Sequence, residues 1–151
     1  MSASFVTSEN AETLWVVRDK VRFMGDVDGR DLSVLEVMVP PGSGTPPHMH
    51  ESAEIFRVLD GEITFGLFDT MPPRQIVAGP GTVVTIGSGE AHNYMNSGDG
   101  PAEMLVVVDT SMKHFFKDLG RTEAPEQGPP SAAEIEEVQR ACARHGISML
   151  G

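Results

Sequence analysis

The stretch that decides the fold runs over residues 42–61 and reads Gly42-Ser-Gly-Thr-Pro-Pro-His48-Met-His50-Glu-Ser-Ala-Glu54-Ile-Phe-Arg-Val-Leu-Asp-Gly61. Its pattern is Gly-x5-His-x-His-x3-Glu-x6-Gly. Because successive side chains of a strand alternate faces, the two-residue offset directs His48 and His50 to the same side of an extended segment. A second stretch adds a third histidine and reads Gly81-Thr-Val-Val-Thr-Ile-Gly-Ser-Gly-Glu-Ala-His92-Asn-Tyr-Met-Asn96.

Three imidazoles and one carboxylate form a donor set that suits a divalent transition metal. The sequence therefore predicts one metal per chain, held by His48, His50, Glu54 and His92. Four protein donors leave one or two coordination positions open on a metal that accepts five or six, and open positions are typical of catalytic sites. The donor set suits Fe, Mn, Ni, Co, Cu or Zn and does not choose among them.

Short β-rich runs, separated by Gly and Pro at close intervals, extend on both sides of the two motifs. This pattern is typical of an antiparallel barrel or sandwich, and no helical periodicity interrupts it. The sequence thus predicts an all-β fold. The expected strands cover residues 13–17, 21–24, 32–39, 54–59, 62–68, 75–78, 82–86, 92–96 and 103–109.

The two motif stretches resemble the paired motifs of the cupin superfamily. The first agrees at every defining position, and the second departs once, with Gly87 where the family usually has Pro, a change that removes no metal donor. The resemblance implies a double-stranded β-helix, or jelly-roll, barrel over residues 1–110, with its motifs at 42–61 and 81–96. It also implies a homodimer, since small cupins commonly pair through edge strands and exposed sheet edges tend to be covered.

Residues 111–151 differ in character and are expected to form a short C-terminal helical extension. Residues 111–119 predict a short helix, and residues 121–130 are rich in Pro, Gly and Glu and predict a linker. Ser131 and Glu134 form a capping-box pattern that begins a second helix, and Gly146 is placed to end it. This tail is similar to that of small quercetinase-like bacterial cupins.

Composition excludes several classes of function. There are 22 acidic and 11 basic residues, a net charge of −11, which disfavours binding to a phosphate backbone. No apolar run approaches the roughly 18 residues that a membrane span requires. The start of the chain lacks the pattern of a secretory signal, and Cys142, the single cysteine, cannot form an intrachain disulfide. These features predict a cytoplasmic protein that binds neither nucleic acid nor membrane.

Strand alternation also predicts the walls of a pocket. If Glu54 and His92 face inward, so do Phe56, Tyr94 and Asn96. Met38 and Phe65, on neighbouring strands, are expected to face the same interior. Such a mostly apolar pocket suits a small aromatic or unsaturated substrate that carries oxygen.

Three functions compete at the level of sequence. The first is a metal-dependent oxidoreductase of the dioxygenase type, acting on an aromatic or enol substrate and similar to quercetinase-like cupins. In those proteins the glutamate that matches Glu54 is held to be both ligand and proton acceptor, so the resemblance makes Glu54 the catalytic candidate. The second is a non-redox metal-dependent isomerase, cyclase or lyase, and the third is a binding module without turnover. The barrel fold alone does not decide among them.

Overall fold

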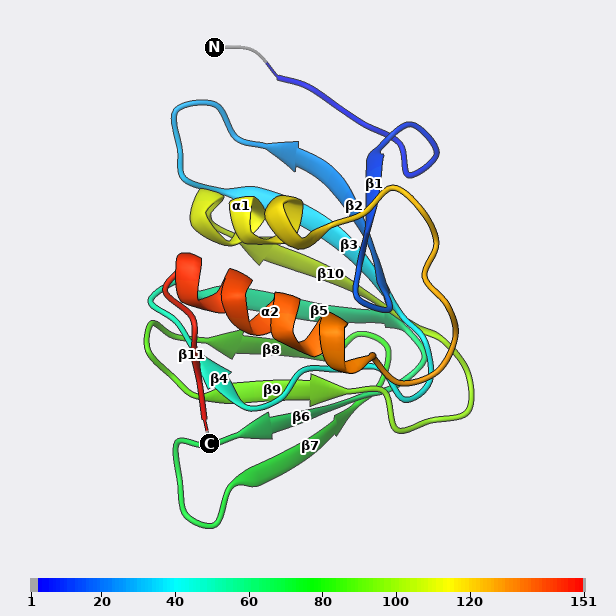
Figure 1. The fold of residues 1–151 in the computed structure, drawn as a ribbon. Helices are drawn as coiled ribbons and strands as arrows, with labels where there is room; N and C mark the ends of the chain where they lie inside the picture. The colour runs from blue at the N-terminus through cyan, green and yellow to red at the C-terminus, as the bar shows by residue number, and fades with distance from the viewer. Residues whose placement is uncertain (1–2, 151) are drawn as a thin grey trace.

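The computed structural model describes residues 3–150, whose strands form two antiparallel sheets that make up a barrel (Figure 1). In spatial order, the strands of the larger sheet are β1 (Glu12–Val16), β2 (Asp19–Asp26), β3 (Ser33–Val39), β10 (Ala102–Val108), β5 (Glu54–Asp60) and β8 (Val83–Ile86). Those of the smaller sheet are β11 (Ser148–Met149), β4 (His48–Met49), β9 (His92–Met95), β6 (Ile63–Leu67) and β7 (Arg74–Ala78). The prediction of an all-β jelly-roll barrel is confirmed.

The alternation of side chains explains where the core lies. In β3 and β10 every second residue is buried and the residues between are half-buried. The buried ones, among them Leu35, Val37, Met104 and Val106, point into the barrel. Burial of such side chains is the main favourable contribution to folding, at about 1.5–3 kcal/mol each. The interior between these strands is therefore mainly apolar.

All nine expected strands are present, and their ends differ from the prediction by at most two residues. Two further strands, β4 and β11, are each two residues long and were not predicted. They pair with each other, Met149 opposite His48 and Ser148 opposite Met49. Strand β11 therefore belongs to the smaller sheet, although it lies in the tail that was predicted to be helical.

The helical extension is confirmed. Helix α1 (Thr110–Leu119) begins at Asp109, whose carboxylate accepts a hydrogen bond from the amide of Met112 at 3.0 Å. Helix α2 (Ala132–Arg144) begins with the expected capping box, in which Ser131 Oγ accepts from the Glu134 amide at 3.1 Å. Gly146, at φ 71°, ends it in the left-handed conformation that favours glycine.

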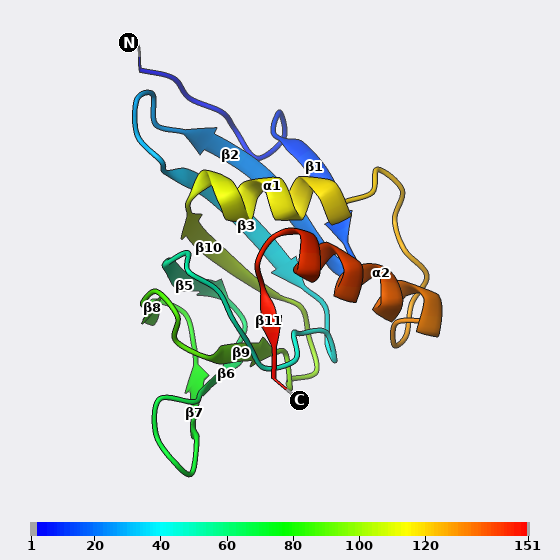
Figure 2. The same cartoon turned by 60° about the vertical axis from the view of Figure 1, so that its left-hand side comes forward.

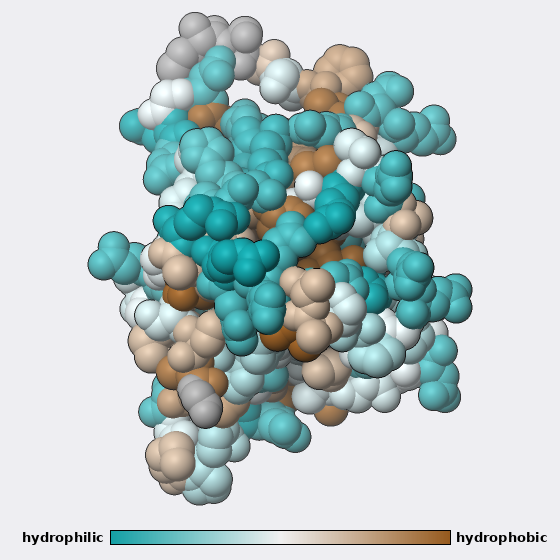
Figure 3. Space-filling view, viewed as in Figure 1, coloured by the Kyte–Doolittle hydropathy of each residue, from teal (hydrophilic) through white to brown (hydrophobic). Residues whose placement is uncertain are grey.

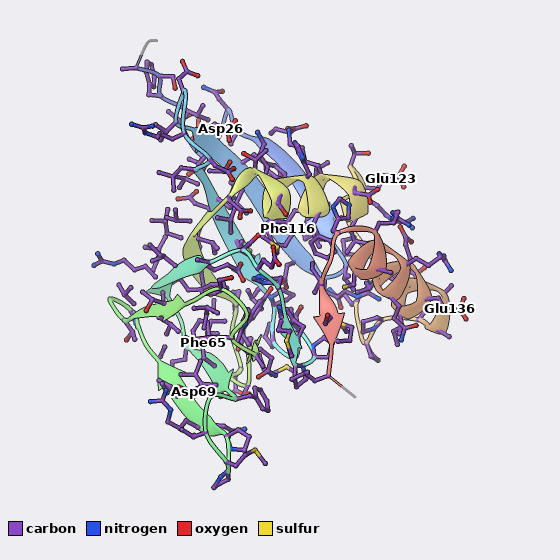
Figure 4. The ribbon with its side chains drawn as sticks, turned by 90° about the vertical axis from the view of Figure 1, so that its left-hand side faces the viewer. Asp26, Phe65, Asp69, Phe116, Glu123 and Glu136 are labelled. Atoms are coloured by element: carbon purple, nitrogen blue, oxygen red, sulfur yellow. The ribbon has the colours of Figure 1, made fainter. Side chains whose placement is uncertain are left out.

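Both helices lie on the same side of the barrel. Figures 1 and 2 show α1 over the larger sheet, α2 beside it, and β11 running back from the end of α2 to the strands that carry the histidines. Figure 4 shows Phe116 between α1 and the middle of the molecule, whereas Glu136 lies on the outer side of α2. The tail thus presents apolar side chains to the barrel and charged ones outward. Among the described residues, no helix is both long and apolar enough to span a bilayer.

Candidate metal centre

The four predicted donors meet where the two sheets come together. His48 lies on β4 and faces His92 on β9 as its antiparallel partner, while Glu54 is the first residue of β5 in the opposite sheet. His50 follows β4 directly. One ligand atom from each of the four residues lies within 4.8 Å of the others, a spacing that could hold one metal ion. The structure thus brings together all four residues that the motifs predicted.

Backbone carbonyls orient all three imidazole rings. His48 Nδ1 lies 2.8 Å from the carbonyl oxygen of Pro46, His50 Nδ1 2.8 Å from that of Ser52, and His92 Nδ1 2.9 Å from that of Glu90. A carbonyl oxygen only accepts hydrogen bonds, so Nδ1 carries the proton and donates it in each neutral ring. The Nε2 lone pair of each histidine is then free for a metal, as in metal sites whose outer contacts fix the tautomer.

The contacts around Glu54 favour the binding of a cation. Its Oε1 lies 2.9 Å from His50 Nε2 and 3.1 Å from His92 Nε2, and its side chain is 4% exposed. A carboxylate oxygen and two ring nitrogens with lone pairs repel one another at these distances unless a proton or a metal ion is shared among them. Moreover, the close contact of His50 Nε2 with Glu54 does not have the geometry of a hydrogen bond, so this buried nitrogen has no hydrogen-bond partner among residues 3–150. The donor set therefore fits a bound divalent metal.

The pKa shifts show that Glu54 attracts positive charge to the centre. Burial disfavours the charged ring of His48 and lowers its pKa to about 4. Burial would raise the pKa of Glu54, but the contacts with His50 and His92 outweigh it and lower that pKa to about 2. Burial likewise opposes charge on His50, yet the Glu54 carboxylate outweighs it and raises the pKa of the ring. At neutral pH the centre thus combines a neutral His48 with a charged carboxylate that attracts a cation.

The centre opens into a cavity of about 600 Å³. Apolar side chains form most of its wall, from the larger sheet (Val37, Phe56 and Met104) and from the tail (Phe116, Ile135 and Leu150). Figure 3 shows hydrophobic residues at the surface between hydrophilic ones on the face that the helices cover. A cavity of this size and lining suits a small, mainly apolar organic molecule.

The predicted pocket residues divide into two groups. Phe56 and Tyr94 line the cavity as expected. Phe65 faces inward but does not line it, since this fully buried ring packs behind the wall, with its centroid 5.3 Å from that of Phe56 and 6.5 Å from that of Tyr94.

For two pocket residues the prediction is wrong. Met38 lies on the outer side of β3, because the buried residues of this strand are the odd-numbered ones and its neighbour Val37 lines the cavity. Asn96 lies just beyond β9, where its amide donates to the carbonyls of Val39 and Gly100 at 2.9 Å each. Its side chain therefore holds a turn together and does not contribute to the cavity.

The sequence pattern missed two contributions to the cavity. Asp19 enters it from β2, and residues of α1, α2 and β11 close it. Asp19 lies far from both motifs along the chain, and a single buried carboxyl at the start of a strand gives no periodic signal. The second helix of the tail was predicted, but the surface against which it packs was not.

An antiparallel double sheet that directs three histidines and a glutamate from these motifs to one point defines the cupin class. Residues 35–108, which include both motifs, match the family described as cupin domain. The chain therefore belongs to the cupin superfamily. Germin-like protein 9-3 of rice, Oryza sativa subsp. japonica, is 32% identical over 83 residues. That match covers 52% of this chain but only 38% of the relative, so the chain spans well under half of the relative's length.

Solved structures show the same fold. The polyketide cyclase RemF of Streptomyces resistomycificus is 24% identical, with a TM-score of 0.62 over 91% of this chain and 97% of that chain. This coverage is too large for the barrel strands alone, so the shared fold includes part of the tail. A predicted oxalate decarboxylase of Thermotoga maritima is 23% identical, with a TM-score of 0.59 over 70% of this chain and 98% of that chain.

Proposed function

We propose that the protein is a metal-dependent oxygenase that acts on a small aromatic or enol-type molecule. The observation that carries this proposal is the convergence of three oriented Nε2 atoms and the Glu54 carboxylate at the wall of an apolar cavity. A divalent metal held there would supply a Lewis acid and, if it is redox-active, a site for dioxygen chemistry.

The protein's own residues would bind and orient the substrate. The apolar wall, which includes Phe56 and Met104, would exclude water and hold the carbon skeleton. Glu54 is the one carboxylate of the donor set and lines the cavity, so it would accept the proton of an enol or phenol hydroxyl bound there. The three histidines would keep their positions, because backbone carbonyls fix their rings.

A non-redox cyclase, isomerase or lyase is the second candidate. Two observations favour it: the likeness to the polyketide cyclase RemF over nearly the whole chain, and a second carboxyl group, Asp19, in the same cavity. Lewis-acid chemistry would need the same four ligands and consume no oxygen. A binding protein without turnover would bind metal and ligand and convert neither.

The test is metal analysis of protein purified without chelators, followed by oxygen uptake with flavonols, diketones and enols. We expect about one divalent metal per chain and oxygen consumption with at least one of these compounds. Product formation without oxygen uptake would replace the oxygenase by the second candidate. Binding without any conversion would leave a binding module.

The same analysis tests the ligand set. His50→Ala should lose most of the metal, because it removes one of the four clustered donor atoms. His114→Ala, which changes a histidine on α1 outside the cluster, should retain it. Equal metal content in the two variants would contradict the assignment of the centre.

A further inference from the structure

A buried carboxyl group lies in the cavity apart from the metal centre. Asp19 is the first residue of β2, is 7% exposed, and lines the same cavity as His48 and His92. Its carboxylate accepts a hydrogen bond from Ser43 Oγ at 2.7 Å and another from the Tyr94 hydroxyl. Both donors are neutral.

Burial raises the pKa of Asp19 to about 6, although these two hydrogen bonds oppose the shift. A buried carboxyl without a cationic partner is costly to the fold, and neither motif of the cupin class accounts for it.

Asp19 has capacity for a further contact. A carboxylate offers about four acceptor positions, and the two hydroxyl groups occupy one on each oxygen. The two donors also fix its orientation, since one hydroxyl comes from the loop before β4 and the other from β9. A fixed acceptor in the wall of an apolar cavity is the kind of polar group that orients a bound molecule.

The position of Asp19 relative to the metal centre follows from β9. Tyr94 lies two residues beyond His92 on the same face of the strand, which separates their Cα atoms by roughly 7 Å. The Phe56 ring lies beside both positions, with its centroid 6.4 Å from that of His92 and 6.3 Å from that of Tyr94. Asp19 and the metal ligands therefore line one cavity from different strands, with the Phe56 and Tyr94 rings in the same wall.

We propose that Asp19, oriented by Ser43 and Tyr94, is a second substrate-binding group that accepts a hydrogen bond from a hydroxyl at the far end of the substrate. The ligand class is an apolar molecule with hydroxyl or enol groups at both ends. One oxygen faces the metal ligands and the other faces Asp19. This inference deepens the proposed function and rests on it.

Two planar probes of the same skeleton test the inference. Isothermal titration calorimetry compares 2-naphthol, which has one hydroxyl, with 2,6-dihydroxynaphthalene, which has one at each end, on protein loaded with redox-inactive zinc. We expect the second probe to bind about tenfold more tightly, the effect of a hydrogen bond to a charged group. In Asp19→Asn, 2,6-dihydroxynaphthalene should bind no more than about twofold more tightly than 2-naphthol, because the charged acceptor is lost. The affinity for 2-naphthol itself should be unchanged, because the apolar wall remains.

Two further variants serve as checks. Gln139→Leu changes another polar residue of the cavity wall, on α2, and should keep the preference for the dihydroxy probe. Asp19→Leu removes both acceptor atoms and should lose it, as Asp19→Asn does. Wild-type protein that binds both probes equally would overturn the inference, and so would Asp19 variants that keep the preference.

The same titrations without zinc separate this inference from the proposed function. With the metal absent, the single hydroxyl of 2-naphthol should turn to Asp19, and Asp19→Asn should then weaken its binding about tenfold. If Asp19→Asn weakens 2-naphthol equally with and without zinc, the metal does not anchor the ligand and the proposed function fails, while the role of Asp19 stands. If Asp19→Asn changes neither probe under either condition, the role of Asp19 is wrong.

Discussion

At the scale of single residues, Glu54 has two separable tasks, because a metal ligand needs only a donor oxygen whereas a proton acceptor needs a carboxylate. Gln keeps a carbonyl oxygen at nearly the same place and is a far weaker base. We expect Glu54→Gln to keep a measurable fraction of the metal and to lose about 10²–10⁴ in turnover per bound metal, the usual contribution of a positioned acid or base. Metal content and turnover must be measured on the same sample, since lost metal would imitate lost catalysis.

Glu51→Gln is the matched control, because this glutamate lies three residues before Glu54 and is exposed. It should keep both metal and turnover. Normal turnover per metal in Glu54→Gln would show that Glu54 is a ligand only.

Asp19 makes a prediction about stability and pH. Its pKa rises from 3.8 to about 6 on folding, mainly through burial, so the folded protein holds this proton more tightly than the unfolded chain does. Its contribution to stability is therefore full below about pH 4 and is lost as the pH rises to 6, by at most ~3 kcal/mol. Asp19→Asn carries no such proton, so its stability relative to wild type should increase between pH 4 and 6 and then level off.

Urea unfolding of metal-free protein at several pH values from 4 to 7 measures this difference. The exposed carboxyl of Asp99 provides a control, and Asp99→Asn should follow the wild type across the range. A constant difference between Asp19→Asn and wild type over these pH values would contradict the shift.

At the scale of elements, β11 supports the metal centre from outside the motifs. Ser148 and Met149 pair with the strand of His48, and the Leu150 amide donates to the Pro47 carbonyl at 2.9 Å. Within residues 3–150, β4 otherwise pairs only with β9, through the single register position of His48 and His92. Deletion of residues 148–151 should therefore lower zinc affinity by roughly ten- to hundredfold, as expected when the support of a ligand is removed.

A competition titration with a chelating dye measures that affinity. Deletion of residues 2–5 removes the same number of residues at the other end of the chain, and it should have no effect. Zinc affinity unchanged by the deletion of residues 148–151 would show that β4 holds His48 without β11.

The elements also show which parts of the structure the sequence could predict. The long strands could be predicted because alternate burial leaves a period of two, and the metal ligands because they stand at the donor positions of two motifs. A two-residue strand such as β11 has no measurable period, and its pairing with β4 joins residues about a hundred positions apart. The place of Asp19 in the cavity likewise depends on contacts between residues far apart in the sequence. Met38 was assigned to the wrong face of β3, because a shift of one residue along a strand exchanges its two faces.

At the scale of the whole molecule, the tail acts as the cover of the barrel. Arg18, at the turn between β1 and β2, pairs with Glu134 at the start of α2 at 2.7 Å and donates to the carbonyls of Gly128 and Pro129. Asp118 on α1 likewise pairs with Arg144 at 3.0 Å. These contacts hold α2 at its two ends, while its apolar stripe, with Ile135 and Cys142, lines the cavity. The cavity that barrel and tail share gives the metal centre a mainly apolar approach.

The last prediction is that the protein is a homodimer, and it concerns the surface that the two helices leave uncovered. We propose that two copies pair through the outer face of the larger sheet near β8, which forms one edge of that sheet. Ile55 on β5 and Val83 on β8 are 44% and 51% exposed there, and edge strands with exposed apolar side chains tend to be covered.

Light scattering at micromolar concentration should give twice the chain mass of 16.2 kDa. The double variant Ile55→Lys with Val83→Lys should give the single-chain mass, because burying two charges from each copy would cost more than the contact supplies. Val77→Lys is the control, since Val77 is 64% exposed but lies on β7 at the edge of the other sheet, and this variant should remain dimeric. A single-chain mass for the wild-type protein would rule the dimer out, and a dimeric double variant would move the interface to another face.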